Sequence, residues 1–443
     1  MGSYAITRNA QNGLPLSVSD GTLANTRTFS GYGEIDGNAY SVGGNTKYNY
    51  SLTRDLAGRI VQKIETIGVA ADTYDYAYDN NGRLTGVRKN GIVTESYTYD
   101  ANGNRLTDGS QAYSYSNEDH IITAGSDTYQ FDADGFLTQK TTAAGTMTTS
   151  YSSRGELLSA TLPSGTAITY DHDPLGRRIA KRVNGAVTEK YLWKDAITLL
   201  AVYDGNDNLL MRFNYADGRL PVSMNQSGNT YYLLYDHIGT LKAVIDASGT
   251  IVKQIDYDSF GSIITDTNPV FAVPFGFAGG LHDRDTNLVR FGARDYDSAI
   301  GRWTAQDPID FAGGDTNLYG YTENNPVNWI DPWGLFKYSP TAGSPVDDKT
   351  KTTTECFEKC SKLEITVTAG KESGHSKGSA HETGEACDIG KNSNPKLSRD
   401  TAENCFKQCF DQKSSYGQEE YNHFHFQTRP GGGGATGFPK GIK

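Results

Sequence analysis

"YAYDNNGRLTGV" (76–87) and "YTYDANGNRLTD" (97–108) share one frame: an aromatic residue, Asp, Gly, Arg and then an apolar residue. The frame returns in "YQFDADGFLTQK" (129–140) and "YDHDPLGRRIAK" (170–181), and looser copies lie at 54–63 and 235–244. Alternating Tyr predicts a strand, Asp-x-x-Gly predicts a turn because Gly tolerates positive φ, and the residues after Gly predict the return strand. Because one hairpin cannot bury its aromatic face, neighbouring repeats must pair into a continuous sheet.

The composition limits the kind of protein. The 443 residues include 50 Gly and 28 Tyr, which favours strands and turns over helices. The net charge is −11 and no run of Lys and Arg occurs, so a nucleic-acid partner is not expected. No stretch approaches the roughly 20 apolar residues of a membrane span. The opening Met1-Gly2-Ser3 lacks a charged and then apolar leader, so no signal peptide is expected.

Two differently built units share the chain. All five cysteines lie in the last 88 residues. Residues 336–443 contain 15 Lys and Arg and 14 Asp and Glu, so the entire acidic excess of the chain lies in the preceding part. Both patterns place a boundary near residue 335.

The repeats resemble the YD repeats of the Rhs family, which is related to the shell-forming part of insecticidal toxin complexes and to teneurins. In those proteins a long β-sheet winds spirally into a hollow cocoon. The resemblance covers about residues 40–335. It implies a mainly β shell over residues 1–335, made of a spiral of β-hairpins, followed by a small α+β domain.

The segment "RFGARDYDSAIGRWTAQDPIDFAGGDTNLYGYTENNPVNWIDPWGL" (290–335) is similar to the end of the Rhs core. Its final Pro-x-x-x-x-Asp-Pro-x-Gly-Leu marks self-cleavage in that family, here after Leu335. Two aspartates serve the cut, and the matching positions are Asp307 and Asp331. Paired carboxylates suit peptide hydrolysis, because one can activate water while the other donates a proton. The residues alone also allow a structural role, since Asp-Pro pairs begin turns.

The tail is predicted to consist of a linker over 336–354 and a domain over 355–443. Two short helical patterns, "ECFEKCSKL" and "AENCFKQCF", each hold Cys-x-x-x-Cys, which places both thiols on one helix face. Two such helices packed antiparallel predict disulfides, with a four-thiolate zinc site as the alternative. Disulfides would require an oxidising compartment such as a bacterial envelope. The pairs favoured are Cys356 with Cys409 and Cys360 with Cys405.

A second constellation in the tail suggests a catalytic zinc ion. "NHFHFQ" alternates like a strand, so His423 and His425 would share a face. His381, Asp388 and one of these two histidines would offer two imidazoles and a carboxylate, which leaves a coordination position for water. Glu420 would be the free carboxylate that accepts a proton from that water.

Ser379-x-His381-x-x-Gly384-x-Ala386-x-Asp388 resembles the first zinc motif of D-alanyl-D-alanine dipeptidases and carboxypeptidases, shared by phage endolysins and the hedgehog-like fold. The Glu-x-x-His pattern of that group would make His423 the third ligand. The His-x-His pattern of murein endopeptidases would instead make it His425, and both remain open. The family's usual Arg is replaced by Lys371, a candidate oxyanion donor.

Together the resemblances imply a secreted Rhs-type antibacterial effector. Its shell would enclose and release a zinc peptidase that hydrolyses D-alanyl peptide bonds of peptidoglycan in the target-cell periplasm. A cognate immunity protein is expected from the family. The alternatives are a zinc-stabilised binding module without turnover, as in hedgehog proteins, and a metallopeptidase directed at proteins.

Overall fold

The computed structural model describes residues 4–10, 13–216, 218–313 and 315–335, together with 367–369, 386–390, 401–402, 405, 416–419 and 423–427. Over this part of the chain antiparallel strands dominate, joined almost always to the next strand along the sequence. No helix of the described residues is long and apolar enough to cross a membrane.

The first sheet is a nine-stranded antiparallel meander. It is followed by a separate two-stranded hairpin of β10 and β11. The strands of these two sheets are β1 (Ala5–Arg8), β2 (Pro15–Ser19), β3 (Leu23–Phe29), β4 (Ile35–Val42), β5 (Asn45–Arg54), β6 (Ile60–Ile67), β7 (Ala70–Tyr78), β8 (Leu84–Lys89), β9 (Ile92–Ser96), β10 (Thr98–Tyr99) and β11 (Arg105–Thr107).

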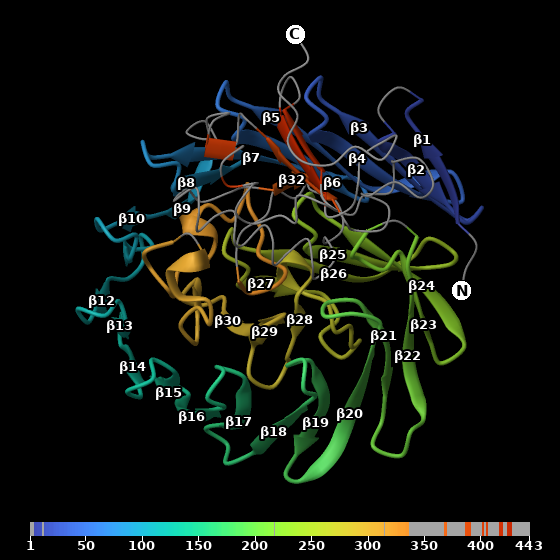
Figure 1. Ribbon diagram of the computed structural model, residues 1–443. Helices are drawn as coiled ribbons and strands as arrows, with labels where there is room; N and C mark the ends of the chain where they lie inside the picture. The colour runs from blue at the N-terminus through green and yellow to red at the C-terminus, as the bar shows by residue number, and fades with distance from the viewer. Residues whose placement is uncertain are drawn as a thin grey trace.

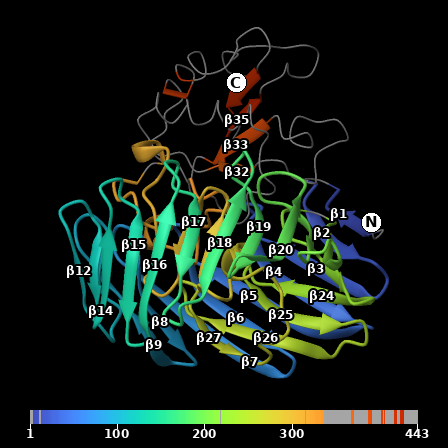
Figure 2. The ribbon, with the colours of Figure 1, turned by 90° about the horizontal axis from the view of Figure 1, so that it is seen from below.

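A sixteen-stranded sheet continues the meander in sequence order. Figure 2 shows β12 to β20 standing side by side along one wall of the molecule. The strands are β12 (Tyr113–Tyr115), β13 (Ile121–Ala124), β14 (Asp127–Phe131), β15 (Leu137–Thr142), β16 (Gly145–Tyr151), β17 (Leu157–Thr161), β18 (Ala167–His172), β19 (Arg178–Val183), β20 (Ala186–Trp193), β21 (Leu199–Tyr203), β22 (Leu209–Asn214), β23 (Ser223–Gln226), β24 (Asn229–Tyr235), β25 (Leu241–Asp246), β26 (Ile251–Tyr257) and β27 (Ile263–Asp266).

The predicted hairpin of each repeat is confirmed, and its turn is held by the repeat's own Asp. Between β7 and β8, Asp79 Oδ1 accepts the backbone N–H groups of Asn81 and Arg83 at 2.9 and 3.0 Å. Asp79 Oδ2 accepts Arg83 Nε at 2.7 Å. Gly82 takes φ of 83°, which an L side chain rarely adopts. The frame Asp-x-x-Gly-Arg therefore closes on itself within five residues.

Neighbouring repeats are joined by the tyrosines of the same frame. The Tyr78 hydroxyl donates to the Ile60 carbonyl at 2.6 Å, and the Tyr99 hydroxyl donates to the Leu84 carbonyl at 2.7 Å. In both cases the acceptor is the first residue of the return strand of the preceding hairpin. A ring that packs in the core thus also satisfies a backbone acceptor of its neighbour.

The strands wrap into a ring whose end overlaps its beginning. Figure 1 shows β1 to β9 along one arc, with β12 to β24 continuing around the rest. Buried Tyr48 and Tyr50 of β5 share a core cluster with Leu234 of β24 and Ile245 of β25. The mainly β shell predicted from the repeats is confirmed.

The inner segment, residues 277–335, lies inside this ring (Figure 1). It carries a four-stranded sheet and three short 3-10 helices. Around them packs an aromatic cluster in which the Tyr296 and Tyr321 ring centroids lie 4.6 Å apart. The elements are η1 (Phe277–Gly279), β28 (Leu281–His282), β29 (Leu288–Phe291), β30 (Arg294–Asp297), β31 (Arg302–Trp303), η2 (Asp310–Gly313) and η3 (Thr322–Asn324).

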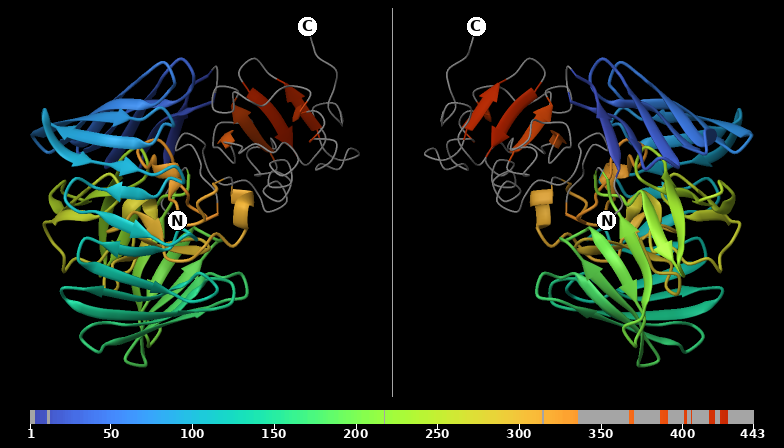
Figure 3. Two further views of the ribbon diagram at one scale, coloured as in Figure 1. Left: turned by 90° about the vertical axis from the view of Figure 1, so that its left-hand side faces the viewer. Right: turned by 90° about the vertical axis from the view of Figure 1, so that its right-hand side faces the viewer.

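Beyond residue 335 the structure describes a four-stranded antiparallel sheet in the order β32-β33-β35-β34. This sheet lies at one open face of the ring (Figure 3). Its strands are β32 (Val367–Ala369), β33 (Ala386–Gly390), β34 (Tyr416–Glu419) and β35 (His423–Gln427). The strand predicted in "NHFHFQ" is thus present, while the division at residue 335 and the enclosure of the tail stay predictions.

The predicted helix pair falls mostly outside the described residues. Thr401, Ala402 and Cys405 are helical, and Cys405 is buried and disulfide-bonded. Cys356, Cys360 and Cys409 lie outside the described residues. The pairing of the cysteines therefore stays a prediction.

Candidate self-cleavage site

The last residues of the shell segment lie directly against the turn between β29 and β30. The Ala293 N–H donates to the Trp333 carbonyl at 2.7 Å. A Cβ on Gly292 would lie 2.2 Å from that carbonyl oxygen, and a Cβ on Gly334 would lie 2.5 Å from the Phe291 carbonyl oxygen. The φ angles of these glycines are 40° and 65°. Only residues without a side chain permit this approach.

Arg294, the first residue of β30, joins the two predicted aspartates. Its Nη2 lies 2.8 Å from Asp307 Oδ2 and 3.4 Å from Asp331 Oδ2. Its Nε donates to the Gly334 carbonyl at 2.7 Å, and its guanidinium lies 4.3 Å from the centre of the Trp303 ring. All three charged side chains are buried. One planar guanidinium thus gathers two carboxylates and the backbone just before the predicted cut.

The predicted cleavage residue lies within the same group. Asp331 Oδ1 accepts the N–H of Leu335 at 3.1 Å. Asp307 Oδ1 accepts the N–H of Ile309 at 3.0 Å, which fixes the orientation of that carboxyl group. The structure therefore brings together Asp307, Asp331 and Leu335, as the motif predicts.

The Asp307 carboxyl group is poised to exchange a proton near neutral pH. Burial raises its pKa to about 7. Arg294 and the Ile309 N–H act in the opposite direction, and the nearby carboxylates of Asp331 and Asp310 add to the rise. Removal from water therefore outweighs the ion pair with Arg294.

The Leu335 carbonyl oxygen lies beside Asp307 across Gly313, the last residue of η2. A Cβ at Gly313 would lie 2.8 Å from Asp307 Oδ2 and 2.8 Å from the Leu335 oxygen. Asp307 and Leu335 both line a cleft with an empty volume of about 360 Å³, its open mouth included. Asp310 and Asp331 also line this cleft. A polar cleft of this size admits water beside Asp307, Asp331 and Leu335.

Two residues of the site had no predicted role. Arg294 begins an Arg-x-Tyr-Asp motif (294–297) within the segment that is similar to the end of the Rhs core. Its link to Asp307 and Asp331, however, depends on contacts over 13 and 37 positions. Gly313 is one of two adjacent glycines in "DFAGGD" and has no local signal of its own. The only sequence signal was the arginine's place in the motif.

The structure places part of the predicted zinc set in one sheet. In the antiparallel pair of β33 and β35, Asp388 lies opposite His425 and Gly390 lies opposite His423. Positions directly opposite each other share a face of the sheet. Both histidine positions are therefore two residues apart on the face that includes Asp388, and the choice between them stays open.

The rest of that set falls outside the described residues, namely Lys371, His381 and Glu420. Within the part of the chain that the structure describes, no group of three or more His, Cys, Asp or Glu could hold a metal ion. An imidazole and a carboxylate at paired strand positions nevertheless fit the donor chemistry of zinc.

The chain was compared with known proteins. The family model of the teneurin YD-shell matches residues 1–327. Teneurin-3 of Danio rerio is 33% identical over 366 residues, covering 74% of this chain and 13% of the relative. Teneurin-4 of Mus musculus is 31% identical over 330 residues, covering 70% and 12%.

Solved structures of toxin complexes are also similar. The Photorhabdus luminescens Tc holotoxin pore, mutation TccC3-D651A, is 19% identical with a TM-score of 0.41, covering 75% of this chain and 21% of that one. TcdB2-TccC3 without the hypervariable C-terminal region is 17% identical with a TM-score of 0.34, covering 73% and 24%.

The family match includes Asp307 and ends before Asp331. It begins at residue 1, earlier than the predicted resemblance from about residue 40. The chain spans about an eighth of the length of the teneurins it matches. On the extent of this match, the chain belongs to the teneurin YD-shell family.

Proposed function

We propose that this shell cuts its own chain after Leu335 and so releases residues 336–443. The observation that supports the proposal is the joining of Asp307 and Asp331 by Arg294, with the Leu335 carbonyl oxygen beside Asp307. The reaction is hydrolysis of the Leu335–Phe336 peptide bond.

The two carboxyl groups divide the proton transfers. Asp331 takes a proton from water as the water oxygen bonds to the Leu335 carbonyl carbon. Asp307 is partly protonated near pH 7 and donates to the carbonyl oxygen as negative charge develops there. When the C–N bond breaks, Asp331 gives its proton to the departing amine of Phe336, a hydroxyl of the tetrahedral intermediate returns a proton to Asp307, and Leu335 gains a new carboxyl group. Arg294 holds both aspartates and offsets the charge.

The test follows cleavage in the full chain by intact mass. Wild type should yield fragments ending at Leu335 and beginning at Phe336, whereas Asp307→Asn and Asp331→Asn should remain whole. Asp134→Asn is the matched control, because Asp134 is exposed and lines none of the clefts described. A cut at another bond, or cleavage unaffected in both Asn variants, would refute the proposal.

A second function is proposed for the released part, on the register that places Asp388 opposite His425. In this proposal His381, Asp388 and one of His423 and His425 hold Zn²⁺. When bound, zinc lowers the pKa of a coordinated water and polarises a carbonyl. Glu420 accepts the water's proton, and Lys371 donates to the developing oxyanion. The substrate class is the D-alanyl peptide bond of peptidoglycan in the target-cell envelope, and an immunity protein would protect the producer.

Metal content and muropeptide profiles test this function separately from self-cleavage. Loss of zinc in only one of His423→Ala and His425→Ala identifies the ligand. Glu420→Ala should keep zinc but abolish the loss of crosslinked muropeptides or the release of D-Ala. Zinc bound with an unchanged muropeptide profile in wild type would favour a binding module or a protein-directed peptidase.

A further inference from the structure

Thr322 lines the same cleft as Asp307, Asp331 and Leu335, and the mechanism above gives it no role. The residue is only 6% exposed, and its hydroxyl oxygen has no hydrogen-bond partner among the described residues. No other polar side-chain atom in the described lining of this cleft is both buried and without a partner. A buried polar group without a partner is costly to the fold, so we expect one where it serves a reaction.

Thr322 is also held in an uncommon backbone conformation. Thr322, Glu323 and Asn324 of η3 have φ angles of 47°, 51° and 59°. Asn tolerates this left-handed region, whereas a β-branched residue such as Thr rarely adopts it. The Asn324 side-chain amide donates to the Gly103 carbonyl at 2.7 Å, so a repeat of the shell holds the turn in place. Strained residues of this kind are common where a side chain must be positioned for function.

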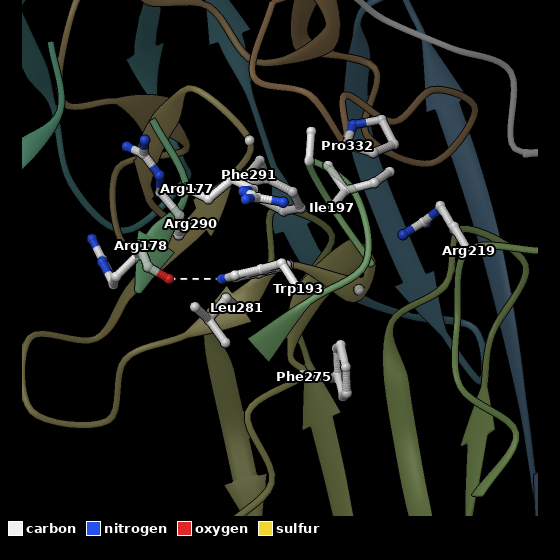
Figure 4. A pocket seen from close by; sticks show the side chains of 14 residues that line it. Arg177, Arg178, Trp193, Ile197, Arg219, Phe275, Leu281, Arg290, Phe291 and Pro332 are labelled. Atoms are coloured by element: carbon white, nitrogen blue, oxygen red, sulfur yellow. Dashed lines mark hydrogen bonds between the residues drawn. The ribbon is translucent and has the colours of Figure 1, made fainter. Parts of the chain in front are cut away.

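The water that attacks Leu335 is best oriented when both of its hydrogens are held, because a lone pair then faces the carbonyl carbon. Asp331 accepts one of them in the proposed mechanism. Pro332, the next residue, lines a separate pocket together with Trp193 and Phe291 (Figure 4). No side chain in the described lining of that pocket has a hydrogen-bond acceptor, because its polar members are Arg and Trp. The second acceptor is therefore expected on the side of the cleft.

We propose that the Thr322 hydroxyl holds the attacking water, an inference that rests on the self-cleavage proposed above. The water donates one hydrogen bond to Asp331 and the other to Thr322 Oγ1, so that its lone pair points at the Leu335 carbonyl carbon. The proton passes to Asp331 as before, while Thr322 keeps its own proton and forms no covalent bond. The cleft has room for about two water molecules, which is enough for this step.

The test measures the half-time of cleavage after synthesis of the full chain. Thr322→Val removes the hydroxyl but keeps the branched side chain and its stiffness. We expect cleavage to be at least about tenfold slower in Thr322→Val, and to stay within about threefold of wild type in Thr322→Ser, which keeps the hydroxyl. Because the hydroxyl has no partner in the uncut chain, Thr322→Val should not lower the urea midpoint of unfolding.

Thr286→Val is the matched control. Thr286 is also buried, but its Oγ1 accepts the Leu288 N–H at 3.3 Å, and it lines neither the cleft nor the pocket of Figure 4. Loss of this hydroxyl should lower the urea midpoint and leave the cleavage rate unchanged. The two Val variants should therefore show opposite patterns, which a general effect of the substitution on folding would not produce.

Cleavage of Thr322→Val at the wild-type rate would overturn this inference and leave the roles of Asp307 and Asp331 intact. Equal slowing in Thr322→Ser and Thr322→Val would also overturn it, because the hydroxyl would then not be the group that matters. A urea midpoint of Thr322→Val below that of wild type would overturn it as well, by showing that the hydroxyl serves the fold. A wild-type chain that stays whole would refute the self-cleavage itself and this inference with it.

Discussion

Gly313→Ala should slow self-cleavage with little effect on the rest of the fold. The new methyl carbon would lie 2.8 Å from both Asp307 Oδ2 and the Leu335 carbonyl oxygen, whereas ordinary contact begins at 3.4 Å. One or both oxygens must therefore move apart by about half an ångström, and a shift of that order at reacting groups costs about 10- to 100-fold in rate. Gly313 has no positive φ, so Ala brings no backbone strain.

The assay is the half-time of conversion of the full chain to its two fragments, followed by gel and intact mass after synthesis. Gly31→Ala is the matched control, because no atom lies within 4 Å of its new carbon. Thermal unfolding of both variants checks that the shell remains folded. Cleavage of Gly313→Ala at the wild-type rate would show that the Leu335 carbonyl does not react in this position. An equal slowing in Gly31→Ala would show that the effect is not specific to the site.

Three further predictions follow from described contacts. The pKa of Asp307 is raised from 3.8 to about 7, and Asp307 is the proposed acid, so the cleavage rate should fall as pH rises through 7, about tenfold per unit well above it. A rate that increases over this range would assign Asp307 the opposite role. Because the folded chain holds the Asp307 proton more tightly than the unfolded chain, the contribution of Asp307 to the free energy of unfolding decreases as pH rises from 3.8 to about 7. Urea titrations at several pH values would measure this decrease. Arg294→Lys keeps one charge but cannot bridge both carboxylates and a carbonyl, so cleavage should slow at least about tenfold and unfolding should require about 1–3 kcal/mol less, measured by fragment half-time and urea titration. Arg83→Gln should lower the free energy of unfolding by about 1 kcal/mol, since its ion pair is partly exposed, while Arg88→Gln on the exposed face of β8 should leave it unchanged.

The repeats could be predicted from sequence because their contacts are local. Asp79 binds groups two and four residues ahead, and Gly82 lies between them, so every partner in the turn is visible within five letters. The overlap of β24 and β25 on β5 was not visible, because it depends on how far each hairpin twists relative to its neighbour. The periodicity therefore predicted a wound sheet and left its closure undetermined.

The contacts of the candidate self-cleavage site, in contrast, are long-range and could not be predicted from the local sequence. Asp307 and Asp331 were identified from a motif, and nothing in their spacing of 24 residues requires them to meet. They meet because Gly292 and Gly334 let two backbone segments touch and because Arg294 lies between them. The contacts of Gly292, Gly334 and Arg294 could therefore be identified only from the folded structure.

Assembly of this site depends on the shell around it. Arg302 of β31 donates to the Asn104 side chain at 2.9 Å and to the Asp119 carbonyl at 2.7 Å, which ties the inner segment to the repeats about 190 residues earlier. The Tyr319 hydroxyl donates to the Gly135 carbonyl at 2.8 Å, one more link of the same kind. We therefore expect the burial that raises the pKa of Asp307 to depend on the ring around residues 277–335. Under the proposed mechanism an unfinished shell has neither the acid nor the clamp, so the chain is cut only when its container is in place.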